Sequence, residues 1–150
     1  MPIRVYLDTS AYNRPFDDQY QPRIWLETLA VSVILQMFET NAATLLASTV
    51  VEYETSRNPH QLRQEWVNKV LVLADGIQII DGSIKQRALE LEQNGLKAID
   101  ALHVSCAEKA NADYFVTCDD RLIRRYQKMK EQLLTVCNPV EFVRATTGEP

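Results

Sequence analysis

The chain has 150 residues, of which 46% are hydrophobic and 24% are charged, and its formal net charge is −4 at pH 7. These values fit one globular domain over residues 1–150, and they exclude a collagen-like, low-complexity or disordered protein. The acidic balance also excludes a general attraction to nucleic acid, so any phosphate binding needs a local basic patch or bound metal.

The predicted elements of the N-terminal half are, in chain order, a strand over 3–7, a polar loop over 13–22, a helix over 23–40, a strand over 44–47 and helices from residues 50 and 60. Pro22 suits the first turn of its helix because proline lacks the N–H that would be unpaired there. Ser48 has the hydroxyl to cap the helix that begins at Val50.

The C-terminal half continues with a strand over 77–80, helices over 84–93 and 97–110, a strand over 114–117, a helix over 121–132, a strand over 133–136 and a short helix that Asn138-Pro139 opens. Ser83 and Gln86 have the spacing of a capping box. The alternation of strands and helices predicts a three-layer α/β/α sandwich with a central parallel sheet.

No segment has the length and apolarity of a signal peptide or a membrane span. Residues 24–38 come nearest, but Glu27 and Gln36 interrupt them. The three cysteines are widely spaced and form no CxxC pair, which is typical of free thiols in a reducing compartment. We therefore expect a cytoplasmic protein that makes no membrane contact.

Four acidic residues occupy comparable places in this pattern. Asp8 and Asp119 directly follow strands, whereas Glu52 and Asp100 lie at the starts of helices. Ligands of parallel α/β sheets bind beyond the C-terminal ends of the strands, so we expect the four acids at one rim. Converging carboxylates repel one another unless a cation joins them, and hard oxygen ligands suit Mg²⁺ or Mn²⁺. Such a cluster is machinery for attack on a phosphodiester, with Asp8 and Asp100 as the strongest ligand candidates.

Nearby side chains compete with members of this set. Glu52 and Glu54 point roughly 200° apart on a helix, so both cannot face one metal, and the motif position favours Glu52. Asp120 competes with Asp119 and is interpreted as the cap of its helix. His103 has the chemistry to touch substrate or order a carboxylate, but a packed or hydrogen-bonded structural role is favoured.

Four motifs, in this order and at this spacing, resemble those of the PIN-domain family, including the VapC-type toxin ribonucleases. The motifs are Leu7-Asp8-Thr9-Ser10, Ser48-Thr49-Val50-Val51-Glu52, Asp100-Ala101-Leu102-His103-Val104-Ser105 and Phe115-Val116-Thr117-Cys118-Asp119. The resemblance implies a PIN-like fold in which Asp8, Glu52, Asp100 and Asp119 form the acidic quartet. Thr9, Ser10 and Thr117 would then orient a water or a carboxylate.

The same resemblance implies metal-dependent hydrolysis of RNA that leaves a 5′-phosphate and a 3′-hydroxyl, and the role of toxin in a type II toxin–antitoxin pair. Many toxin-type members run directly from the first motif into an apolar helix, whereas this chain inserts residues 12–19. The candidate RNA contacts are Arg14, Arg121, Arg124, Arg125 and Lys128, although a solvated basic face explains the last four equally simply.

The helix over 23–40 is apolar around much of its circumference. One reading is an interface for a homodimer or an antitoxin protein, and the other is burial in the core. Two further functions stay open from the residues: a small-molecule phosphatase with Asp8 as nucleophile, and a nucleic-acid-binding module with suppressed activity.

Overall fold

The computed structural model describes residues 2–148. The strands are β1 (Ile3–Leu7), β2 (Ala43–Ser48), β3 (Ile77–Gln78), β4 (Tyr114–Val116) and β5 (Thr135–Cys137). The helices are α1 (Thr9–Asn13), a 3-10 turn η1 (Arg14–Phe16), α2 (Pro22–Glu39), α3 (Thr49–Ser56), α4 (Gln61–Leu71), α5 (Gly82–Gln93), α6 (Ala98–Lys109), α7 (Asp120–Gln127) and α8 (Pro139–Thr147).

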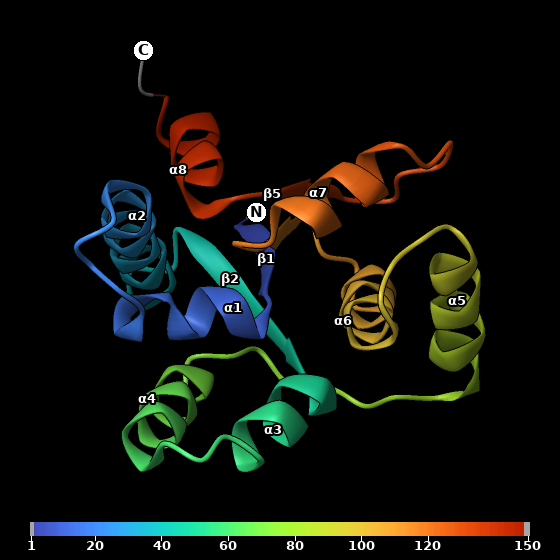
Figure 1. The fold of residues 1–150 in the computed structure, drawn as a ribbon, viewed down its shortest axis with the longest axis horizontal. Helices are drawn as coiled ribbons and strands as arrows, with labels where there is room; N and C mark the ends of the chain where they lie inside the picture. Colours follow the sequence, from blue (N-terminus) through green and yellow to red (C-terminus); the bar gives the residue numbers. More distant parts are fainter. Residues whose placement is uncertain (1, 149–150) are drawn as a thin grey trace.

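The strands form one parallel sheet in the order β3-β2-β1-β4-β5. Helices α2 and α8 pack together on one face, and α6 covers the other face with α5 outside it (Figure 1). This arrangement confirms the predicted three-layer α/β/α sandwich. Because β1 is central and all strands run the same way, the residues that follow β1, β2 and β4 meet at one edge of the sheet.

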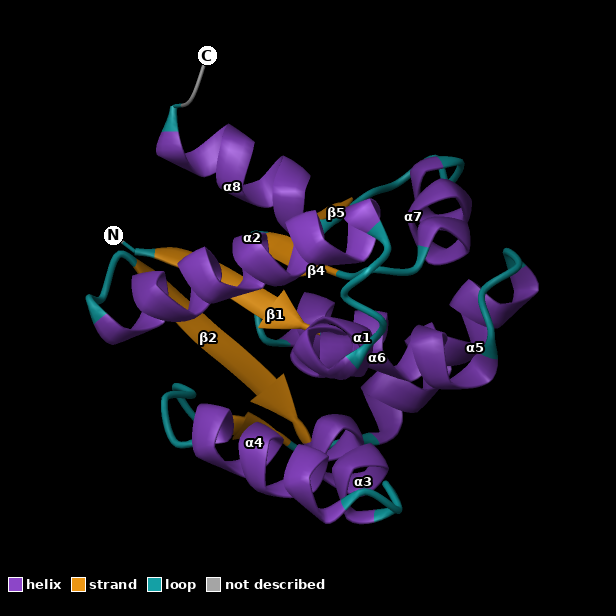
Figure 2. Cartoon of the chain, turned by 60° about the vertical axis from the view of Figure 1, so that its left-hand side comes forward, coloured by secondary structure: helices purple, strands orange, loops and turns teal. Residues whose placement is uncertain are grey.

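The core lies between the sheet and these helices, and it includes the C-terminal part of the central strand β1. Val5, Tyr6 and Leu7 have no exposed surface. Both faces of β1 are covered, which explains why its last three residues are all apolar or aromatic instead of alternating with polar ones. Figure 2 shows β1 and β2 running side by side toward α1 and α3, which both begin at the C-terminal edge.

Several predicted boundaries differ from the structure. The loop predicted over residues 13–22 contains η1, and α1 precedes it. Strand β3 is only two residues long, and α7 ends at Gln127, five residues before the predicted end. Helix α5 is capped by Asp81, which accepts a hydrogen bond from the backbone N–H of Ile84, so the predicted Ser83 capping box is wrong. An aspartate two residues earlier meets the same backbone need.

Other predicted ends are confirmed. Ser48 caps α3 by accepting from the N–H of Val50, and Asn138 caps α8 by accepting from the N–H of Glu141. Gly95 follows α5 at φ 104°, a left-handed conformation that glycine adopts without strain. Within residues 2–148, no helix combines the length and apolarity that crossing a membrane requires.

Candidate functional site

Asp8 directly follows the last residue of β1 and is buried, with 4% of its surface exposed. Its carboxylate accepts hydrogen bonds on both oxygens. Ser10 Oγ donates to Oδ1 at 2.6 Å, and Thr117 Oγ1 donates to Oδ2 at 2.6 Å. The N–H of Ala11 also donates to Oδ1, so Asp8 is the N-cap of α1. Burial raises the pKa of Asp8, although these hydrogen bonds act in the opposite direction.

The two hydroxyls that hold Asp8 are themselves oriented by the turn between β4 and α7. The N–H of Cys118 donates to Ser10 Oγ at 3.0 Å, and the N–H of Asp119 donates to Thr117 Oγ1 at 3.0 Å. Each hydroxyl therefore accepts from backbone and passes its own proton to the carboxylate. This network connects the end of β1 to the end of β4 and fixes the orientation of Asp8.

Glu54 is the acidic residue that α3 directs to the same edge. Thr9 Oγ1 donates a short hydrogen bond to Glu54 Oε1, and His103 Nε2 lies 2.5 Å from that oxygen. Partial burial raises the pKa of Glu54, but the hydrogen bond and charge of His103 and the hydrogen bond from Thr9 outweigh burial and lower it. Glu52 is exposed on another side of α3, so Glu54 takes the place that sequence reasoning gave to Glu52.

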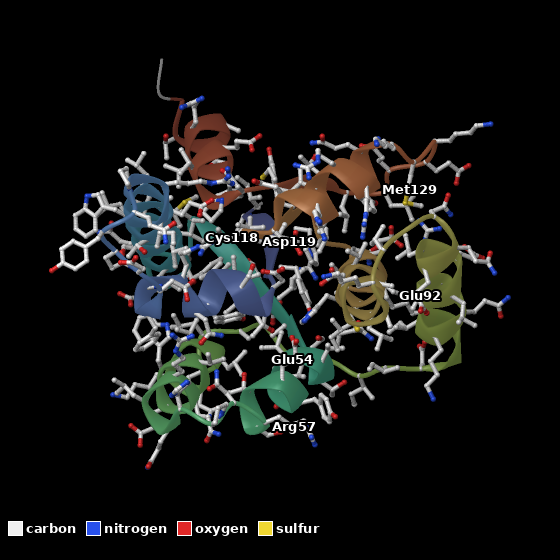
Figure 3. All side chains as sticks on the ribbon, viewed as in Figure 1. Glu54, Arg57, Glu92, Cys118, Asp119 and Met129 are labelled. Atoms are coloured by element: carbon white, nitrogen blue, oxygen red, sulfur yellow. The ribbon has the colours of Figure 1, made fainter. Side chains whose placement is uncertain are left out.

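A sequence signal for Glu54 existed in the apolar residues of α3. Glu54 lies three residues after Val51 and four after Val50, and both valines are buried. Residues at these spacings share a helix face, so the face that packs inward also carries Glu54. Glu52 and Tyr53 fall between such positions and are exposed. Figure 3 shows Glu54 nearer than Arg57 to the middle of the molecule, where Asp119 also lies.

Asp100 and Asp119 complete the acidic set. Asp119 is the N-cap of α7, where its Oδ1 accepts from the N–H groups of Arg121 and Leu122. Asp100 lies in the first turn of α6, and no described group hydrogen-bonds its carboxylate. Burial, followed by the charges of Asp8 and Asp119, raises the pKa of Asp100 to about 6. The three aspartates are therefore close enough to repel one another.

These side chains surround one small polar pocket of about 150 Å³. Its lining consists of Asp8, Thr9, Ser10, Glu54, Asp100 and Asp119, together with His103. The structure thus brings together three of the four predicted acids and two of the three predicted supporting residues. The third, Thr117, lies beneath the pocket, where it bonds Asp8 and Ser10.

The chemistry of this set fits a hard divalent cation. Glu54 Oε2 and Asp119 Oδ2 accept no hydrogen bond from residues 2–148, and the Asp100 carboxylate is likewise free, so oxygens remain to bind an ion. In the side-chain positions described, no three acidic, histidine or cysteine side chains stand close enough to hold one ion. The Asp100 carboxylate accepts no hydrogen bond from residues 2–148, so a rotation of this side chain can bring a further oxygen toward an ion.

Arg14 and Asp120 have partners away from this pocket. Arg14 pairs with Asp17 at 2.9 Å and with the buried Glu27 at 3.2 Å, so its guanidinium is held between the inserted segment and α2. Asp120 does not cap α7, contrary to the prediction, and instead pairs with Arg23 at 2.6 Å. These ion pairs connect the inserted segment and α7 to the start of α2.

The remaining basic candidates lie along α7. Arg121, Arg124 and Lys128 are exposed, and their spacing of three and four residues places them on one side of the helix. Arg125 is half-buried, with its Cδ 3.9 Å from where a Cβ on Gly95 would lie. Because Asp119, the N-cap of α7, lines the pocket, this basic row starts at the rim of the pocket.

The chain is thus an α/β protein with an acidic pocket at the C-terminal edge of its five-stranded parallel sheet. The PIN-domain family model matches residues 5–128, which contain every acidic residue of the pocket. The chain belongs to the PIN-domain family, whose members are typically nucleases that use divalent metal ions. No protein with curated function matches the chain.

A solved structure shares the fold. It is described as "VapBC2 from Rickettsia felis bound to a DNA fragment from their promoter". The similarity has a TM-score of 0.55 at 22% sequence identity, and it covers 91% of this chain and 98% of the other. At this level of identity the likeness concerns the fold, and any shared function is a matter for the next subsection.

Proposed function

We propose that this protein is a divalent-metal-dependent endoribonuclease whose acidic set is Asp8, Glu54, Asp100 and Asp119. The observation that supports this most directly is the repulsion within the pocket: the pKa of Asp100 rises to about 6 partly because Asp8 and Asp119 lie nearby. A site that gathers negative charge in this way is stabilised by a cation. Mg²⁺ or Mn²⁺ held there supplies water activation and charge neutralisation at a phosphodiester.

The residues have separate tasks in this proposal. Asp8 is rigid, because Ser10 and Thr117 hold both of its oxygens, and it sets the base of the site. Glu54 and Asp119 each use one oxygen within the fold, and the other accepts no hydrogen bond from residues 2–148. Asp100 has the freedom to adjust to the ions. In this set, Asp8 is fixed through both oxygens and Asp100 is adjustable. Glu54 and Asp119 are each held through one oxygen.

The buried state of Asp8 argues against the phosphatase alternative. A nucleophilic aspartate must present an unshared oxygen to phosphorus. Both Asp8 oxygens accept hydrogen bonds from side chains, and 4% of the residue is exposed.

The basic row on α7 favours a polyanionic substrate, because Arg121, Arg124 and Lys128 make no ion pair within residues 2–148.

The proposed biological role is the toxin of a type II toxin–antitoxin pair, in the cytoplasm. The similarity in fold to VapBC2 supports this role. A groove of about 290 Å³ between α2 and α8, lined by Leu26, Leu29, Val33 and Val143, offers an apolar surface to an antitoxin segment. Trp25, also on α2, is 50% exposed. The alternative is that the same apolar surface of α2 binds a second copy of the chain and forms a homodimer.

The test of the proposed function is cleavage of RNA by purified protein with Mg²⁺, with Mn²⁺ and with chelator. Cleavage is expected only with metal. Glu54→Gln should abolish it, whereas Glu52→Gln, a matched change two residues away on the exposed side of α3, should leave it near the wild-type rate. Cleavage that persists in chelator, or loss in the Glu52 variant alone, would contradict the proposal.

A further inference from the structure

A chain of short hydrogen bonds runs from the core of the sheet to Glu54. Ser48 Oγ lies 2.6 Å from the Tyr6 hydroxyl, which lies 2.7 Å from His103 Nδ1. His103 Nε2 lies 2.5 Å from Glu54 Oε1. The chain begins at the end of β2, passes through β1 and α6, and ends on α3, so it couples four elements through side chains.

The interior members of this chain have no solvent to replace their partners. Tyr6 and Ser48 are 0% exposed and His103 is 2% exposed. Tyr6 is also stacked on Phe115, with ring centroids 5.3 Å apart, so its hydroxyl has little freedom to move. Buried polar groups that lose a hydrogen bond are costly, and the three groups therefore hold one another in place.

The hydrogen-bond directions follow from the partners. An ionised carboxylate only accepts, so His103 Nε2 carries a proton and donates to Glu54. In a neutral ring, a proton on Nε2 leaves Nδ1 as an acceptor for the Tyr6 hydroxyl, which can in turn accept from Ser48. Ser48 Oγ itself accepts from the N–H of Val50. Tyr6 and Glu54 thus hold the two ring nitrogens of His103, and the Nε2 proton is directed at one oxygen of Glu54.

We infer that His103 is a positioning residue for the acidic site: supported by Tyr6 and Ser48, it holds Glu54 Oε1 so that Oε2 faces the pocket. This inference rests on the proposed function in one respect, namely that Glu54 Oε2 binds a divalent ion. A glutamate side chain that nothing holds samples many rotamers, and a fixed donor removes that freedom. Thr9 donates to the same Oε1 and closes the arrangement from α1.

The test measures Mn²⁺ binding without RNA, from the electron paramagnetic resonance signal of free Mn²⁺. His103→Leu removes the donor and should weaken Mn²⁺ affinity about 10- to 100-fold, the usual effect of losing an outer partner of a metal ligand. His103→Gln keeps an N–H near the position of Nε2 and should restore most of the affinity. His60→Gln, at the other histidine of the chain, is the matched control and should bind as wild type.

A double variant identifies the route of the effect. If His103 acts through Glu54, then His103→Leu combined with Glu54→Gln should bind Mn²⁺ no more weakly than Glu54→Gln alone. Should His103→Leu fail to fold, Tyr6→Phe removes only one buried oxygen and should weaken Mn²⁺ binding in the same direction, with an unchanged circular dichroism spectrum.

The outcomes separate this inference from the proposed function. Wild type that binds Mn²⁺ but cuts no RNA would refute the nuclease, while the variants still decide the role of His103. Unchanged Mn²⁺ affinity in His103→Leu, additive effects in the double variant, or wild type that binds no Mn²⁺ would each overturn the inference.

Discussion

Neutralising Asp100 should stabilise the protein when no metal is present. Asp100→Asn keeps the shape of the side chain and removes the charge that Asp8 and Asp119 repel. Asp100 suits the experiment because no described group hydrogen-bonds its carboxylate, so the amide leaves no partner unpaired. Asp8 is less suitable, because Ser10 and Thr117 both donate to it.

The size of the effect follows from the pKa of Asp100, which rises from 3.8 to about 6 on folding. Since one pKa unit corresponds to about 1.36 kcal/mol, the ionised carboxylate costs the folded state about 3 kcal/mol above neutral pH. Its favourable interaction with the N-terminus of α6 offsets about 0.3–1 kcal/mol of that. A net gain of about 2 kcal/mol should raise the melting temperature by about 4–8 °C in a chain of this length.

The pH dependence has a definite sign. Because the folded pKa is raised, the stabilising contribution of protonated Asp100 is fully present below its unfolded pKa and is lost as pH rises through about 6. Wild type and Asp100→Asn should therefore melt together below pH ~4, diverge between about pH 4 and 6, and differ by a nearly constant amount above about pH 7, with the variant more stable.

The assay is thermal unfolding in chelator and in added Mg²⁺ or Mn²⁺ across this pH range. Metal should raise the melting temperature of wild type more than that of Asp100→Asn, since a ligand that binds the folded state stabilises it by an amount that grows with the logarithm of its affinity. Asp75→Asn, at an exposed residue outside the pocket, controls for the change in net charge. A variant several degrees less stable in chelator, or an equal response to metal, would show that Asp100 is only a helix-terminal residue.

Three further variants test the other parts of the site. Asp8→Asn should lose RNA cleavage while its circular dichroism spectrum stays native, and near-native turnover would remove Asp8 from the acidic set. Arg124→Ala should weaken RNA binding and reduce the slope of log affinity against log salt by about one phosphate contact, and an unchanged slope would place RNA elsewhere. Leu29→Asp should abolish antitoxin binding or self-association in light scattering without lowering RNA cleavage; a partner still bound at full affinity would exclude the α2–α8 groove.

The sequence predicted the elements whose ends have a local chemical cause. Ser48 and Asn138 precede α3 and α8, and both side chains accept the backbone N–H groups that any helix start leaves unpaired. Asp8 and Asp119 were predictable as neighbours because parallel strands end at one edge of a sheet. In each case one residue type satisfies a need that arises within a few residues along the chain.

Where two nearby residues offered the same chemistry, the packing of their helix decided which one enters the site. Glu52 and Glu54 are both glutamates on α3, and Glu54 enters the site because Val50 and Val51 turn its side of the helix inward to Thr9 and His103. Packing also gave Asp119 and Asp120 different roles, because Asp119 caps α7 and Asp120 pairs with Arg23 on α2.

The chain of hydrogen bonds through His103 was beyond sequence reasoning for a related reason. Tyr6 and His103 are 97 residues apart, and their contact exists only because α6 packs on the sheet face to which Tyr6 points. Local sequence patterns determine which polar atoms need hydrogen-bond partners, whereas the packing of elements distant in sequence determines which residue supplies each partner. The type of chemistry at the site was therefore readable from the residues, and its geometry depended on contacts that form only when the chain has folded.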